Sequence, residues 1–303
     1  MDALDPHAPL VSPEIAARLA RLSLQARRMP EARRRGRRRT RRPGGGADFI
    51  DTRPYALGDD PRRIAWPAFA RLERLLVRLV ADDAPLRLAL VVDTSSSMGF
   101  SSNGAPSKLV QAARIAAGLA TVALTGEDRV GVVSSSSTAS PVLRASGGRI
   151  GLGRLYGALD ALAPSGTTDL GAAASAASRA TGGRALCVIL SDFLDPAGAL
   201  AGARAMCARG HEVALVEVLD PQEIDPPDLS GHDLEDQETG EIVVLPAEGA
   251  TEAYLAALAT HRAAIDAGAA EIGAPVLRVS TTEPFDSIVC LAIRAGLLRS
   301  QRT

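Results

Sequence analysis

The sequence predicts an α/β fold with a doubly wound, mostly parallel sheet flanked by helices, plus a small β-rich subdomain. From residue 86 onward, short apolar runs bounded by turn residues alternate with longer stretches of helical periodicity. The apolar runs are continuous, as expected for strands buried on both faces. Hydrophobic residues make up 46% of the 303 residues and aromatic residues only 3%. The core must therefore consist mainly of Leu, Val, Ile and Ala.

The first 46 residues are expected to form a short helix followed by a flexible arm. Ser12-Pro13-Glu14 is a helix start signal, and Ile15 and Leu19 then fall on one helical face. Residues 27–42 hold ten Arg and one Glu, although the whole chain has a net charge of −1. This arm is either a solvated linker or a contact for nucleic acid, anionic lipid or an acidic protein surface. Nucleic-acid binding is the weaker possibility, because no aromatic residues are interleaved with the arginines.

Residues 47–83 are predicted to form a small β-like subdomain. The stretch 48–55 reads as extended, a turn follows, and residues 75–80 have the alternation of a strand. A short helical turn between them carries Trp66, the single Trp of the chain. We expect Trp66 and Phe69 to form the small core of this unit.

The α/β domain is predicted to span residues 84–303. Its strands are expected at 86–92, 129–134, 141–144, 185–190, 212–218 and 275–279. Its helices are expected at 107–125, 150–162, 168–180, 197–209, 250–267 and 284–299. An insertion rich in Pro, Asp and Glu covers 221–247, and Thr239-Gly240 within it has the composition of a hairpin turn. We expect this hairpin to pair with the small subdomain, because both are short β pieces that need a partner.

A cluster of oxygen-bearing side chains follows the first strand of this domain. Asp93, Ser95 and Ser97 come directly after the apolar run, and ligand sites of open α/β sheets lie at the carboxyl ends of strands. Carboxylate and hydroxyl oxygens suit Mg²⁺ or Mn²⁺ and not zinc. The alternative is a polar loop that caps the next helix.

Two further segments favour the metal site. The strand at 185–190 ends in Ser191-Asp192, and the loop before the helix expected at 168 reads Ser165-Gly-Thr-Thr-Asp169. Hydroxyls and carboxylates thus recur where the carboxyl ends of parallel strands meet.

The pattern Asp-x-Ser-x-Ser, a Thr in a Gly-Thr loop and an Asp after a later strand resembles the metal-ion-dependent adhesion site (MIDAS) of von Willebrand factor A domains. The resemblance implies a von Willebrand A-like fold and a Mg²⁺ site. Thr168 is preferred over Thr167 because it directly precedes Asp-Leu, as in that family's usual Gly-Thr-Asp-Leu. The implied metal ligands are Asp93, Ser95, Ser97, Thr168 and Asp192.

A second resemblance covers residues 48–245. Its motifs are Arg53-Pro-Tyr55, Gly58-Asp-Asp-Pro-Arg62, Ile64-Ala-Trp66, Ala70-Arg71, Ser191-Asp-Phe193, Asp220-Pro-Gln-Glu223 and Asp236-Gln-Glu-Thr-Gly-Glu241. They resemble domain-of-unknown-function family fifty-eight, except that Ala65 stands where the family usually has Asp. The resemblance implies a von Willebrand A-like binding module working beside a MoxR-type AAA+ ATPase in protein assembly or maturation.

The favoured function is a non-enzymatic, metal-dependent, chaperone-like protein-interaction module. An unknown client would supply a carboxylate to the open position of the metal, because Mg²⁺ prefers octahedral oxygen coordination. One alternative is a phosphoryl-transfer hydrolase with Asp93 as nucleophile. Such enzymes need a second Asp two residues after the nucleophile, where this chain has Ser95. The sequence also lacks a phosphate-binding Gly-Lys-Ser/Thr loop. Nucleic-acid or membrane-surface binding through residues 27–42 is the other alternative, and would depend steeply on salt.

Three scattered cysteines and the lack of a CxxC pair argue against a disulfide framework or a zinc cluster. No run approaches the ~18–20 apolar residues of a membrane span, and no secretory signal is recognisable. A cytoplasmic location is expected.

Overall fold

The computed structural model describes residues 10–20, 49–56, 61, 64–80, 85–246 and 248–294. The Arg-rich stretch 27–42 lies outside these residues. The described residues belong to two compact units, one with α1 and everything from residue 85 onward and one with β1, α2 and β2.

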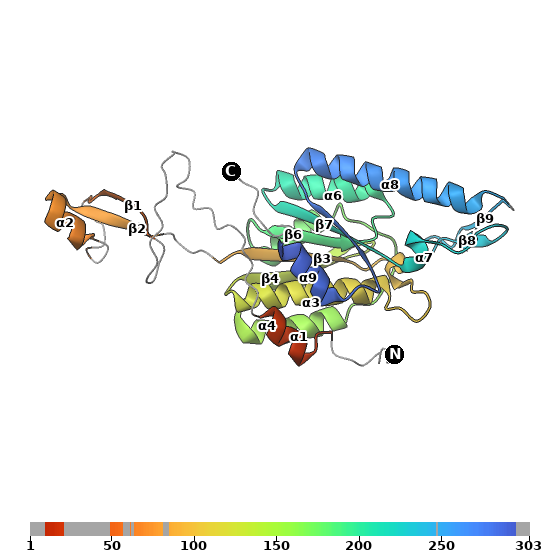
Figure 1. The fold of residues 1–303 in the computed structure, drawn as a ribbon, viewed down its shortest axis with the longest axis horizontal. Helices are drawn as coiled ribbons and strands as arrows, with labels where there is room; N and C mark the ends of the chain where they lie inside the picture. Colours follow the sequence, from red (N-terminus) through yellow and green to blue (C-terminus); the bar gives the residue numbers. More distant parts are fainter. Residues whose placement is uncertain are drawn as a thin grey trace. The chain divides into compact units, whose positions relative to one another are not determined.

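The larger unit contains a six-stranded sheet in the order β10-β7-β6-β3-β4-β5 (Figure 1). All neighbouring strands are parallel except β5, which runs antiparallel to β4 at the edge. The strands are β3 (Arg87–Asp93), β4 (Arg129–Ser135), β5 (Ala139–Ser146), β6 (Leu186–Ser191), β7 (Glu212–Leu219) and β10 (Val276–Ser280). The predicted mostly parallel α/β sheet is confirmed.

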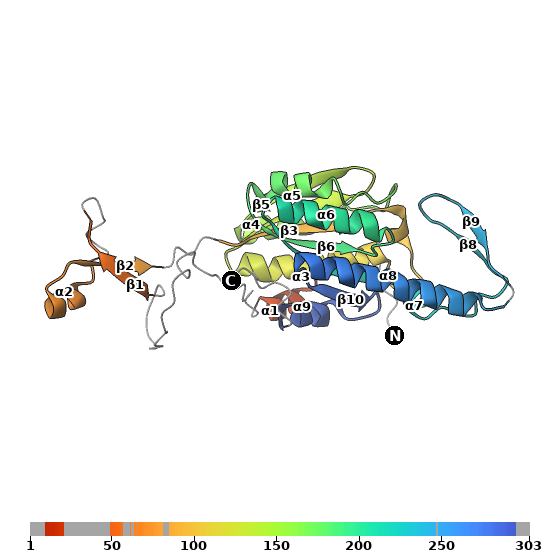
Figure 2. The ribbon, with the colours of Figure 1, turned by 90° about the horizontal axis from the view of Figure 1, so that it is seen from above.

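Helices cover both faces of this sheet (Figures 1 and 2). One face packs against α1 (Pro13–Leu19), α3 (Lys108–Thr125), α4 (Gly148–Asp160) and α9 (Phe285–Arg294). The other packs against α5 (Ala173–Thr181), α6 (Pro196–Ala208) and α8 (Ala250–Ile272). The sequence of strand β3 is continuously apolar because its two faces are buried in different cores. Leu88 and Leu90 enter the first core and Ala89 and Val91 the second, and all four are fully buried.

Short elements lie at the end of the sheet where strands β3 and β6 end. A 3₁₀ turn, η3 (Ser96–Gly99), follows β3, and α7 (Pro221–Ile224) follows β7. The insertion forms a hairpin from β8 (Asp233–Glu235) and β9 (Ile242–Val244), which stands off the body of this unit (Figure 2).

The expected pairing of this hairpin with residues 47–83 stays a prediction. Within the described residues β8 and β9 pair only with each other.

The smaller unit is a two-stranded antiparallel sheet of β1 (Phe49–Pro54) and β2 (Leu76–Val80), joined through α2 (Trp66–Leu72). Trp66 and Phe69 do not form its core, contrary to expectation. They pack edge to face at 6.2 Å but are 57% and 38% exposed, whereas Ile64, Ala65 and Val77 are buried. Because α2 is a single short helix, its aromatic side chains can contact each other without being covered.

The predicted helix 168–180 starts later than expected. Helix α5 begins at Ala173, so Thr168 lies in the preceding loop. This shift matters for the site, because a loop residue can turn its side chain towards the ends of the strands.

Candidate metal centre

Two aspartates end adjacent parallel strands in the middle of the sheet. Asp93 ends β3 and Asp192 directly follows β6, and the two strands are paired up to Val92 and Leu190. The side chains of both aspartates are buried, with exposures of 0% and 1%. Parallel pairing therefore brings these two predicted ligands to the same edge of the sheet.

Among the described residues, the carboxylate of Asp93 receives hydrogen bonds only from neutral groups. The backbone N–H of Ser95 donates to its Oδ1 at 2.9 Å, and the hydroxyls of Ser191 and Thr168 donate to its Oδ2 at 2.6 and 3.4 Å. Burial, together with the negative charge of Asp192, raises the pKa of Asp93 from 3.8 to about 6, although the hydrogen bonds from Ser191 and Ser95 oppose this shift. The hydrogen bonds do not replace the solvation that the carboxylate loses. A cation beside Asp93 would remove this cost.

Three hydroxyls lie beside this carboxylate. The turn η3 brings the Oγ atoms of Ser95 and Ser97 to within 3.0 Å of each other. The loop that carries Thr168 is held against η3 by backbone hydrogen bonds from Ser96 to Gly166 and from Ser165 to Thr94, at 2.9 and 2.7 Å. Gly166 has a φ of +71°, which favours glycine at this position. The loop is therefore anchored immediately before the residue that reaches the site.

Of the two candidate threonines, Thr168 is the one that reaches the cluster. Its hydroxyl lies within hydrogen-bond distance of Glu238 and of Asp93, at 3.0 and 3.4 Å, and can donate to one of them at a time, and its backbone N–H donates to Glu238. Thr167 is exposed.

Glu238, in the turn of the β8–β9 hairpin, is a site residue that the sequence analysis missed. Its Oε1 accepts hydrogen bonds from the hydroxyls of Ser97 and Thr168 at 3.1 and 3.0 Å, and its Oε2 accepts one from the backbone N–H of Thr168 at 3.1 Å. The sequence signal was the acidic motif Asp236–Glu241, which we used only for resemblance. Glu238 is 141 residues from Ser97 along the chain, so spacing could not indicate this contact.

Asp192, the fifth predicted ligand, already has a cationic partner. The Nζ of Lys108 donates to its Oδ2 at 2.7 Å and to Oε1 of Glu223 at 2.6 Å. Burial lowers the pKa of Lys108, but the carboxylates of Asp192 and Glu223 more than compensate, so that its pKa is raised. Lys108 is 1% exposed and is the single lysine of the chain. The structure thus brings Asp93, Ser95, Ser97 and Thr168 together and pairs Asp192 with an ammonium group.

The oxygens around Asp93 are spaced as metal ligands would be. Contacts of 3.0, 3.1, 3.0 and 3.4 Å lead from Ser95 through Ser97, Glu238 and Thr168 to Asp93. Around an octahedral Mg²⁺ with metal–oxygen distances of about 2.0–2.1 Å, neighbouring ligand oxygens are about 3 Å apart. All five side chains offer hard oxygen donors. The residues present therefore fit Mg²⁺ or Mn²⁺.

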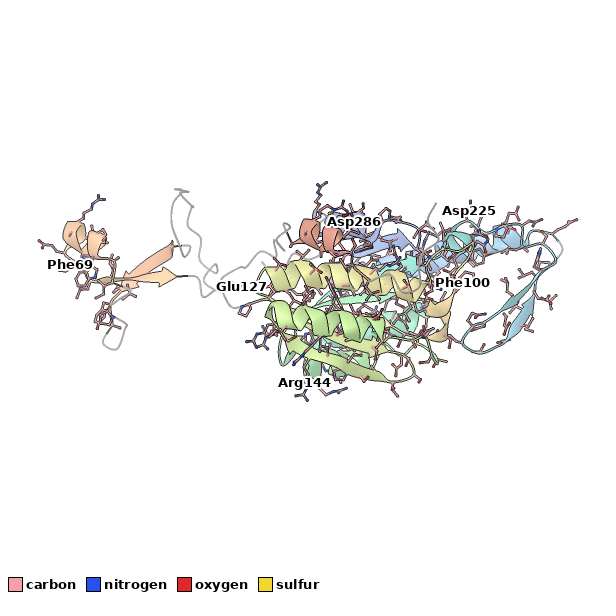
Figure 3. All side chains as sticks on the ribbon, turned by 90° about the horizontal axis from the view of Figure 1, so that it is seen from below. Phe69, Phe100, Glu127, Arg144, Asp225 and Asp286 are labelled. Atoms are coloured by element: carbon pink, nitrogen blue, oxygen red, sulfur yellow. The ribbon has the colours of Figure 1, made fainter. Side chains whose placement is uncertain are left out.

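The cluster lies at one end of the α/β body. Phe100, which follows η3, and Asp225, which follows α7, are at this end, where the hairpin projects (Figure 3). Among the described residues no helix is long and apolar enough to cross a membrane.

The strand order defines a mostly parallel α/β domain, with the oxygen cluster at the carboxyl ends of its central strands. Comparison with known families makes the assignment specific. Residues 51–264 match the model of the family described as "Protein of unknown function DUF58", and the chain belongs to this family.

Mycobacterial proteins are similar to this chain, one over most of its length and another over about a third. "Uncharacterized protein Rv1480" of Mycobacterium tuberculosis H37Rv is 32% identical over 273 residues, which are 89% of this chain and 86% of that protein. "Uncharacterized protein MAV169" of Mycobacterium avium is 36% identical over 99 residues, which are 32% of this chain and 58% of that protein.

Three solved structures to which this chain is similar have TM-scores below 0.5. BatB from Bacteroides thetaiotaomicron has a TM-score of 0.45 at 19% identity, covering 69% of this chain and 96% of that one. An aerotolerance-related membrane protein from Bacteroides fragilis has a TM-score of 0.47 at 22% identity, covering 70% and 98%. The VWA domain of SpRpn10 has a TM-score of 0.41 at 12% identity, covering 73% and 100%.

Proposed function

We propose that this protein is a metal-dependent protein-interaction module, in which Asp93, Ser95, Ser97 and Thr168 hold Mg²⁺ or Mn²⁺. The observation that carries the proposal is the buried carboxylate of Asp93, whose hydrogen-bond donors among the described residues are two hydroxyls and one backbone N–H, all of them neutral. A divalent cation bound there would neutralise Asp93 and accept a carboxylate from a partner. Asp192 acts on this metal through its charge, because one of its oxygens is engaged by Lys108.

The partner that we propose is a MoxR-type AAA+ ATPase together with a client protein that supplies the carboxylate. The support for the ATPase is the family resemblance of the sequence. The support for a carboxylate is the position of Glu238, whose two oxygens accept hydrogen bonds from Ser97 and Thr168.

A binding role explains the site better than phosphoryl transfer. Position 95, where such hydrolases carry their second Asp, is a Ser whose hydroxyl contacts Ser97. We therefore propose a non-enzymatic role.

The test is calorimetric titration of Mg²⁺ and Mn²⁺ into the wild type, Asp93→Asn and Asp160→Asn. Asp160 is an exposed carboxylate at the end of α4 and serves as the matched control. We expect Asp93→Asn to weaken binding by about 100-fold or more, because losing a direct ligand costs at least as much as losing its second-shell support. Asp160→Asn should bind as the wild type does.

Capture of a purified MoxR-type ATPase, with and without EDTA, then tests the partner. Capture should require the metal and be lost with Asp93→Asn. A wild type that binds neither metal, or capture indifferent to both EDTA and Asp93→Asn, would overturn the proposed mechanism. Phosphatase activity lost in Asp93→Asn would favour the hydrolase instead.

A further inference from the structure

The turn of the β8–β9 hairpin places a carboxylate of this chain among the proposed metal ligands. Both oxygens of Glu238 are used, and all three donors belong to Ser97 and Thr168. Glu238 is half-buried, whereas Glu235 and Glu241 in the same hairpin are exposed. One of three neighbouring glutamates is thus selected for the site by the shape of the turn.

The turn is built to present this side chain. The carboxylate of Asp236 accepts hydrogen bonds from the backbone N–H groups of Glu238 and Thr239, at 2.7 and 3.1 Å. The N–H of Gly240 donates to the carbonyl of Asp236 at 2.8 Å, and Gly240 has a φ of +71°. These bonds hold the turn without help from the rest of the domain, so Glu238 is oriented before it reaches the site.

The rest of the hairpin is held weakly. Residues 233–235 and 242–244 are exposed, and these two strands pair only with each other in the part of the chain that the structure describes. The base of the insertion is tied to α8, where Leu229 N–H donates to the hydroxyl of Thr251 at 3.0 Å. The contacts of Glu238 are therefore the described side-chain contacts that hold the turn of the hairpin at the ends of the strands.

We infer that Glu238 is an intramolecular ligand of the metal and that a carboxylate of the partner must displace it. This inference rests on the proposed metal-dependent function and adds the closed state of the same site. In that state Glu238 occupies the position that a Glu or Asp of the partner would take. Glu238 would then compete with the partner for the metal. Only a partner carboxylate that binds the metal more tightly than Glu238, or is present at a high local concentration, would displace it.

The first part of the test compares Glu238→Gln with Glu241→Gln by Mg²⁺ calorimetry. Gln keeps the shape of the side chain and can still accept hydrogen bonds, but it removes the charge. We expect Glu238→Gln to weaken Mg²⁺ binding about tenfold, because affinity for the ion depends on the number of charged ligands. Glu241→Gln should bind Mg²⁺ as the wild type does.

The second part uses a fluorescent cyclic peptide that copies residues 233–244, followed by fluorescence polarisation. In Mg²⁺ this peptide should bind Glu238→Gln at least about tenfold more tightly than the wild type, because the intramolecular competitor has been removed. The same peptide with its own E238Q change should not bind, and EDTA should abolish binding. Glu241→Gln should behave as the wild type.

The outcomes separate the two proposals. If the wild type binds Mg²⁺ through Asp93 but Glu238→Gln changes neither Mg²⁺ affinity nor peptide binding, the closed state is wrong and the metal-dependent function stands. If the wild type binds no metal, both proposals fall. Equal peptide binding by the wild type and Glu238→Gln would also overturn the displacement step.

Discussion

The two aspartates at the ends of β3 and β6 occupy similar places but have different electrostatic partners. Both are buried and both come from the middle of the sheet. Asp192 accepts a hydrogen bond from the ammonium group of Lys108, whereas the donors to Asp93 are two hydroxyls and a backbone N–H. A buried carboxylate is costly unless a positive charge or enough hydrogen bonds compensate it. Among the described residues, Asp192 therefore has a cationic partner, Lys108, whereas the hydrogen-bond donors to Asp93 are all neutral.

This difference divides the predicted ligand set. Asp93 and the three hydroxyls form the half that a metal would complete. Asp192 belongs to a network with Lys108 and Glu223, and the N–H of Asp220 donates to the same Glu223 at 2.8 Å. Through Asp220 this network also reaches Ser102, whose backbone N–H donates to the Asp220 carboxylate at 3.0 Å. The second half of the site is thus tied to the end of β7.

The largest expected effect comes from removing the internal cation. Lys108→Met leaves the carboxylates of Asp192 and Glu223 buried without a counter-charge, so we expect a loss of about 3–5 kcal/mol in the free energy of unfolding. Urea unfolding followed by circular dichroism measures it. Adding Glu223→Gln to Lys108→Met should recover part of the loss, because one unpaired charge is removed. A Lys108→Met protein as stable as the wild type would mean that the ammonium group does not balance Asp192.

An effect of the opposite sign is expected at Asp93 in the metal-free protein. Since folding raises its pKa from 3.8 to about 6, the folded state binds more protons between these values and stability falls as the pH rises through them. The loss above pH 6 is about 3 kcal/mol at most. Asp93→Asn cannot ionise, so in EDTA at pH 7.5 it should be more stable than the wild type by up to this amount.

The measurement is the urea midpoint in EDTA at pH 4 and at pH 7.5. The stability advantage of Asp93→Asn should grow with pH between these two values. If Asp93→Asn were instead less stable at pH 7.5, the hydrogen bonds of the carboxylate would outweigh its burial, and the contrast with Asp192 would fail.

The smallest expected effect distinguishes the two threonines of the loop. Thr168→Ala removes a hydroxyl that contacts Asp93 and Glu238, so we expect a loss of about 1 kcal/mol in the free energy of unfolding. Thr167→Ala, at the exposed neighbour, should change it by less than about 0.5 kcal/mol. Thermal unfolding of both variants in EDTA tests the pair. Equal effects would mean that the loop, and not the hydroxyl of Thr168, determines stability here.

Some of the structure could be predicted because it depends on local pattern. The run 86–92 is buried on both faces in the sheet, so its composition indicated a central strand without knowledge of its neighbours. The boundary of α5 could not be read in the same way. Ala, Gly and Thr around Thr168 allow a helix as well as a loop, and backbone bonds to η3 decide for the loop. Trp66 and Phe69 were misplaced because hydrophobic character alone does not show whether a short helix will be covered.

The sequence by itself determined the alternation of strands and helices, and with it the edge where Asp93, Ser95, Ser97 and Asp192 meet, because these residues follow short apolar runs bounded by turn residues, which predict buried strands. Only the tertiary structure decided what else reaches that edge. Lys108 lies at the start of a helix and Glu238 in the turn of an inserted hairpin, 84 residues from Asp192 and 70 from Thr168. Contacts at such separations follow from how the elements pack in three dimensions, and no local period in the sequence encodes them.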